Sequence, residues 1–129
     1  MSRERTIEPI FEGETFPMRA RVSNPETLFA ITQADVEEIL LRVFDLDGDD
    51  ISRPIHREVL EVSDHVSDSL ITDSSPIEGG YNVYDDPPNV NYKNKIEGGH
   101  RYRFQWEIRR TEERSPIFLV LTVPVLSVW

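Results

Sequence analysis

The chain has 129 residues, the length of a single domain that buries roughly two thirds of the surface its unfolded form would expose. It contains no cysteine, which excludes disulfide bonds and thiolate metal sites. Its formal net charge of -10 works against contact with a phosphate backbone, so nucleic acid is not an expected partner. No run of about 20 apolar residues and no secretory signal occurs, so we expect no membrane partner and synthesis in the cytoplasm.

The first 14 residues alternate in charge and carry three isolated apolar side chains, Ile7, Ile10 and Phe11. Such a segment is too short and too polar to form a core of its own. We therefore expect an extended N-terminal arm over residues 1–14 that uses these three side chains to bind another surface. A single domain is expected over residues 15–129.

The first half of that domain contains two predicted core strands. Residues 15–22 alternate apolar and polar side chains, as a strand with one buried face does. Residues 32–46 fit both a helical stripe and a strand rich in branched residues. We favour a short helical turn near residues 33–37, then a strand from Glu38 that ends at an Asp-Gly turn.

The middle of the chain has shorter patterns. Residues 57–62 and 65–72 read as two short strands that could pair as a meander, and residues 81–86 read as a third. Residues 87–99 open with two prolines and form a long polar connection.

The clearest strand covers residues 100–110. Four alternate positions are apolar and the positions between them are polar, a pattern that a helix does not give; the apolar side chains are Tyr102, Phe104, Trp106 and Ile108. Trp106 is therefore expected in the core. A polar turn leads to a second strand over residues 116–129, in which Pro124 indicates an edge position or a bulge. These two strands are predicted to form a C-terminal hairpin.

About seven short strands with frequent turn signals predict an all-β protein, an antiparallel immunoglobulin-like β-sandwich with at most one short helical turn. A small barrel would give a similar pattern.

An acidic loop is the main candidate for metal binding. Asp45, Asp47 and Asp49 lie on a tight turn, and calcium prefers several carboxylate oxygens. The spacing of an EF-hand fails, because its glycine position is Asp50 and its final glutamate position is His56. We favour an Asp-Gly turn, with a calcium site as the alternative.

Catalytic signatures are absent from the sequence. His56, His65 and His100 show no zinc-ligand spacing, and no nucleophile elbow, phosphate loop or dinucleotide motif occurs. We therefore expect no enzymatic activity and no cofactor.

Three stretches together carry a resemblance: GETFPMRARV, ITQADVEEILLRVFDL, and GGYNVYDDPP followed by EGGHRYRFQWEIRR. They are similar to the small immunoglobulin-like β proteins of tailed bacteriophages, including the amino-terminal domain of baseplate upper proteins. The likeness rests on strand pattern and loop phrases and implies a structural role in the virion, with no site residues to carry over. We expect a lone domain that departs from the baseplate proteins in having no fibre or receptor-binding extension.

The leading hypothesis is a non-enzymatic accessory subunit of a phage particle that decorates the head or joins tail or baseplate components. Its expected partners are other virion structural proteins and further copies of itself. The alternative is a ligand-binding module, such as a carbohydrate-binding sandwich, that uses Tyr81, Tyr84 or Tyr92 as an exposed aromatic platform.

Overall fold

The computed structural model describes residues 2–6, 9–11, 14–73, 77, 79–87 and 96–127. Strands make up most of its regular structure: β1 (Ser2–Thr6), β2 (Ile10–Phe11), β3 (Met18–Ala20), β4 (Val36–Asp45), β5 (His56–Leu60), β6 (Val66–Ile71), β7 (Tyr81–Asp85), β8 (Arg101–Arg110) and β9 (Ile117–Leu126). Two helical turns interrupt them, the 3-10 turn η1 (Gln33–Asp35) and α1 (Val62–His65). Among the described residues, no helix has the length and apolarity needed to cross a membrane.

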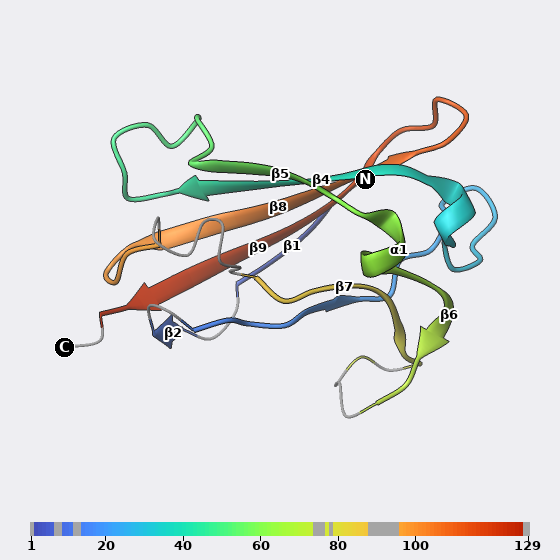
Figure 1. Ribbon diagram of the computed structural model, residues 1–129, viewed down its shortest axis with the longest axis horizontal. Helices are drawn as coiled ribbons and strands as arrows, with labels where there is room; N and C mark the ends of the chain where they lie inside the picture. Colours follow the sequence, from blue (N-terminus) through green and yellow to red (C-terminus); the bar gives the residue numbers. More distant parts are fainter. Residues whose placement is uncertain are drawn as a thin grey trace.

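The strands form two sheets (Figure 1). The larger has the order β1-β9-β8-β4-β5, with β2 also beside β9, and the smaller has the order β3-β7-β6. With β3 taken as strand B and β9 as strand G, these are the neighbours of an immunoglobulin-like sandwich. The predicted all-β sandwich is confirmed. It is not antiparallel throughout, because β1 and β2 run parallel to β9.

The meander predicted for the middle of the chain is wrong. β5 pairs with β4 in the larger sheet, whereas β6 pairs with β7 in the smaller one. The turn α1 carries the chain between the sheets and is the one α-helix among the described residues, beside the 3-10 turn η1. At the end of α1, His65 Nδ1 lies 2.9 Å from the carbonyl oxygen of Tyr84 on β7, and this contact ties the crossover to the smaller sheet.

The alternation predicted for β8 is confirmed. Its four apolar side chains, including Trp106, all face the core and are essentially buried. Trp106 Nε1 donates a hydrogen bond of 2.9 Å to Asp85 Oδ2, which joins the two sheets. The Tyr102 hydroxyl accepts one of 2.7 Å from the Glu97 backbone N–H, as in the tyrosine corner of immunoglobulin domains. Two residues later, where antibody domains have a cysteine, Phe104 meets Phe16 edge to face at 5.0 Å.

The N-terminal segment adds to the edge of the larger sheet. β1 pairs with residues 118–122 of β9, and β2 pairs with Val125 and Leu126 of the same strand. The predicted hairpin of β8 and β9 is confirmed. The Val125 N–H donates a hydrogen bond of 2.9 Å to the carbonyl of His100, the residue before β8. Alternation therefore turns the Pro124 nitrogen toward the N-terminal segment. Pro124 has no N–H to donate, and it lies where the ladder passes from β1 to β2.

Candidate functional site

The loop between β3 and β4 presents two large apolar side chains to solvent. Leu28 is 79% exposed and Phe29 is 77% exposed. The turn that carries them is closed by backbone hydrogen bonds of 2.7 Å from the Leu28 N–H to the Asn24 carbonyl and from the Asn24 N–H to the Phe29 carbonyl. Leu28 has φ of 67°, a conformation that a bulky residue rarely adopts. Two side chains that water disfavours are thus held outward by a tightly bonded loop, which we term the Leu28–Phe29 tip.

The buried side-chain amide of Asn82, on the smaller sheet, holds this loop through hydrogen bonds. Asn82 lies on β7 with no exposed surface. Its Oδ1 accepts a hydrogen bond of 2.8 Å from the Val22 N–H, and its Nδ2 donates to the carbonyls of Val22 at 2.9 Å and Ile31 at 3.0 Å. A single side chain therefore binds both ends of the loop to a core strand.

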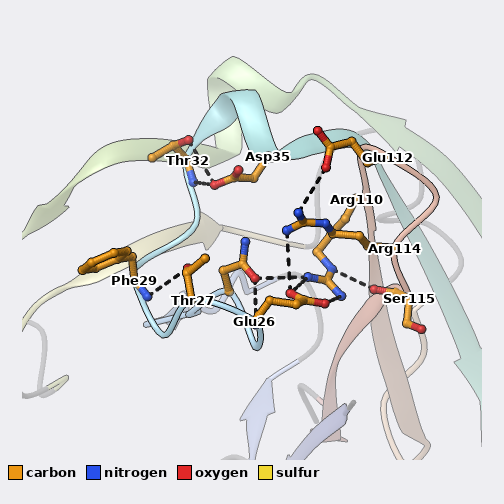
Figure 2. A network of polar contacts seen from close by, with 10 residues as sticks. Glu26, Thr27, Phe29, Thr32, Asp35, Arg110, Glu112, Arg114 and Ser115 are labelled. Carbon is orange, nitrogen blue, oxygen red and sulfur yellow. Dashed lines mark hydrogen bonds and ion pairs between the residues drawn. The ribbon is translucent and has the colours of Figure 1, made fainter.

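A buried arginine joins this loop to the loop between β8 and β9 (Figure 2). Arg110 is 4% exposed, and its guanidinium meets both carboxylate oxygens of Glu26, at 2.6 Å and 3.1 Å. Its Nε donates to the Ser115 carbonyl at 2.7 Å. The hydrogen bond from Arg110 lowers the pKa of Glu26. In Figure 2 the Phe29 ring points away from this network.

Backbone strain gathers in the same two loops. Among the described residues other than glycine, positive φ occurs at Leu28, Glu112 and Glu113. Each such conformation costs of order 1 kcal/mol or more and persists only where the surroundings hold it, which is typical of binding sites. We define the loop end as residues 21–37, 61–68 and 110–116, which lie together at one end of the sandwich (Figure 1).

The loop end is acidic. It carries three arginines, Arg21, Arg110 and Arg114, and eight carboxylates, Glu26, Asp35, Glu37, Glu61, Asp64, Asp68, Glu112 and Glu113. Beside it lies a shallow cleft of about 420 Å³ between the start of β4 and the end of β5. Val36, Leu60 and Val62 contribute apolar surface to the cleft, and Glu37 and Glu61 are among its polar residues. No aromatic residue lines it.

Two of the three carboxylates of the proposed calcium loop, Asp45 and Asp47, are engaged by protein groups. Asp45 lies 2.8 Å from His100 Nδ1, and Asp47 accepts hydrogen bonds from the backbone and guanidinium of Arg101. The hydrogen bond from Arg101 lowers the pKa of Asp47. Within the described residues, no group of three or more metal-ligating side chains forms. Calcium would have to displace both cations to use Asp45 and Asp47 together with Asp49.

The predicted aromatic platform is wrong at Tyr81. This side chain is buried, and its hydroxyl donates a hydrogen bond of 2.7 Å to Asp73 on the neighbouring strand segment. Its ring meets Tyr84 edge to face at 6.0 Å, so both rings are used in packing. Tyr92 lies outside the described residues.

The three predicted interaction residues of the arm have different outcomes. Ile10 is partly buried and packs on the core. Phe11 is half exposed beside Leu126, its neighbour in the ladder between β2 and β9. Ile7 lies outside the described residues. Of the two described residues, Phe11 is the more exposed, and β2 lies at the other side of the molecule from the loop end (Figure 1).

Sequence reasoning missed the tip and its supports. Leu28 and Phe29 read as part of a weak apolar run next to Ala30 and Ile31, and an apolar pair in a loop looks like core. The sequence could have indicated Arg110. It falls in phase with the inward positions of the β8 alternation, which places a charged side chain inside the sandwich.

No protein-family model, curated protein or solved structure matches this chain. The assignment to the immunoglobulin-like class accordingly rests on the strand order described above.

Proposed function

We propose that this protein is a non-enzymatic binding subunit, an accessory structural protein of a phage particle, that holds a neighbouring virion protein through the Leu28–Phe29 tip. The observation that carries the binding role is the tip itself. Two adjacent large apolar side chains are exposed on a strained loop that is fixed by Asn82 and by Arg110. Exposed apolar groups of this kind mark protein contact sites.

A fixed loop is better suited to binding than a mobile one, because little conformational entropy is lost when a partner orders it. Immunoglobulin-like sandwiches gather their loops at the ends of the sheets, and such loops bind partners on a rigid scaffold. The phage particle enters this proposal through the resemblance of the three sequence stretches named above.

Binding to particles tests the proposal. The tagged protein is mixed with phage particles purified from cultures of the organism that encodes it and sedimented through a density gradient. We expect the wild-type protein to sediment with the particles and the double variant Leu28→Ser/Phe29→Ser to remain at the top. The matched control is Ile51→Ser, which removes another exposed apolar side chain from a loop at the opposite end.

Each result decides one part of the proposal. Failure of the wild-type protein to sediment with particles would contradict the virion role. Equal sedimentation of the tip variant and the wild type would contradict the role of the Leu28–Phe29 tip. Loss of binding in Ile51→Ser as well would mean that general surface hydrophobicity, rather than the tip, drives the contact.

A further inference from the structure

The outer face that β5, β4, β8 and β9 form on the larger sheet carries a net positive charge, whereas the chain as a whole is negative. The register of β5, β4, β8 and β9 turns alternate side chains away from the core. The charged residues at these outward positions are two glutamates, Glu38 and Glu107, and five arginines, Arg42, Arg57, Arg101, Arg103 and Arg109. On a chain with a formal net charge of -10, this cationic face stands out.

Two arginines on this face lack the carboxylate partners that the others have. Arg42 pairs with Glu107 at 2.7 Å, and Arg109 pairs with Glu107 and Glu38. Within the part of the chain that the structure describes, neither Arg57 nor Arg103 forms an ion pair. Arg57 also stands directly opposite Arg42 across the strands, and like charges in that position are destabilising. An external anion would relieve this repulsion.

Apolar groups lie among these cations. Val59 is 63% exposed on the edge strand β5, in register with Leu40 on the same outward side. The Arg103 guanidinium covers the Phe44 ring at 4.7 Å, and Phe118 on β9 is partly exposed. The face thus offers apolar side chains interspersed with arginines and with Glu107.

The loop end offers the complement, namely exposed Leu28 and Phe29 among eight carboxylates and three arginines. A broad face and an end of one sandwich cannot meet within a single copy. Two outer faces brought together would oppose arginines, and two loop ends would oppose carboxylates, so both symmetric pairings are unfavourable. The remaining arrangement places the loop end of one copy on the outer face of the next.

We propose that copies of this chain assemble head to face, with the loop end of one copy bound to the outer face of the larger sheet of its neighbour. This inference rests on the proposed binding role of the Leu28–Phe29 tip. Because the two surfaces differ, each copy keeps one free surface of each kind, and the contact repeats into a ring or a filament. A virion subunit present in many copies can use such a repeat.

The test uses two variants that each lose one surface. The tip variant is Leu28→Ser/Phe29→Ser, and the face variant is Arg57→Glu/Val59→Ser, at two exposed positions of β5. The matched control is Arg53→Glu/Ile51→Ser, which makes the same charge change and also removes an exposed aliphatic side chain, in the loop between β4 and β5. Circular dichroism confirms that each variant is folded.

Sedimentation velocity over a concentration series gives the mass. We expect the wild type and the control to grow beyond dimers as concentration rises, and each single-surface variant to stay at the mass of one chain. An equimolar mixture of the two variants should stop at a dimer, because it retains one intact pair of surfaces. Raising the ionic strength should weaken this dimer.

A wild-type protein that remains monomeric at its highest soluble concentration would overturn the head-to-face contact. So would a mixture that stays monomeric while the wild type assembles. If the wild type is monomeric and yet binds particles through its tip, the proposed function stands and only this inference fails. If it assembles through the tip but never sediments with particles, the head-to-face contact stands and the virion role fails.

Discussion

Arg110 holds a charge in a place where most of its hydration is lost, so its partners decide whether it stabilises the fold. Removing the side chain leaves the Ser115 carbonyl without its donor and Glu26 without its closer cation, since Arg114 lies at 3.9 Å. We expect Arg110→Ala to lower the free energy of unfolding by about 2–4 kcal/mol. Its neighbour Arg109 is exposed, so Arg109→Ala should change little. Urea denaturation measures both, and equal losses would contradict this account.

Asp85 shows how one hydrogen bond can offset burial. Burial raises the pKa of Asp85, while the hydrogen bond from Trp106 Nε1 opposes that rise. We expect Asp85→Asn to keep or increase the free energy of unfolding at pH 7, because an amide oxygen still accepts from the indole and no buried charge remains. Asp85→Ala should cost about 1–3 kcal/mol, since the indole N–H then lacks its acceptor.

The raised pKa of Asp85 also determines how its contribution to the free energy of unfolding changes with pH. The folded state binds this proton more tightly than the unfolded chain, so the group adds stability as the pH falls through its folded pKa toward the unfolded value. Comparison of the wild type with Asp85→Asn in that window, by denaturation at several pH values, isolates the effect. A wild type that instead loses stability relative to Asp85→Asn on acidification would contradict it.

His100 has a linkage of the same sign, but here the charged form of the side chain is the one that the fold favours. The hydrogen bond with Asp45 raises the pKa of His100 in the folded state. The protonated pair therefore stabilises the fold fully below the unfolded value of about 6.5, and this contribution disappears as the pH rises through the folded pKa. We expect the stability difference between the wild type and His100→Gln to shrink from pH 5.5 to pH 8.5. A difference that grows with pH would show that Asp45 does not hold the charged form.

At the scale of elements, β1 protects an edge of the larger sheet. It covers the backbone of β9 through five paired positions. Deleting residues 1–8 should lower the free energy of unfolding by about 1–5 kcal/mol, at a fraction of a kcal/mol to about 1 kcal/mol for each cross-strand pair. The bared β9 edge should also promote aggregation. Denaturation and light scattering check this, against a control in which residues 1–8 are replaced by glycine and serine.

The elements that the sequence predicts well are those with a strong local pattern. The alternation in β8 and the apolar run in β9 are each enough to place a strand, and the polar turn between them makes a hairpin. The turn η1 also falls where a Thr-x-x-Asp start indicates it, and Thr32 and Asp35 form the capping contacts.

The rest depends on long-range packing that no local pattern records. The sequence of α1 reads as part of two short strands, and only the need to carry the chain from the larger sheet to the smaller one makes it a helical turn. The loop end is similarly non-local. Asn82, Glu26 and Arg110 come from three distant segments. The hydrogen bonds from Asn82 to Val22 and from Arg110 to Glu26 form only once both sheets are stacked.

At the scale of the whole molecule, the distribution of charge separates the surfaces by role. The core receives the apolar sides of the strands, and the loop end and the outer face take opposite charge. An even spread would serve solubility equally well, because only the net charge governs repulsion between copies at a distance. The segregation of carboxylates at the end and arginines on the face instead favours one orientation between neighbours.

The whole chain also sets the order of folding. β1 and β9 lie at opposite ends of the sequence, so their ladder closes the longest loop and can form only after β9 is in place on β8. Stabilisation gained after the transition state changes the unfolding rate alone. We therefore expect deletion of residues 1–8 to leave the refolding rate unchanged and to speed unfolding about fivefold or more in stopped-flow measurements. If refolding slows by the same factor, the pairing of β1 with β9 belongs to the folding nucleus, and the two ends of the chain meet early.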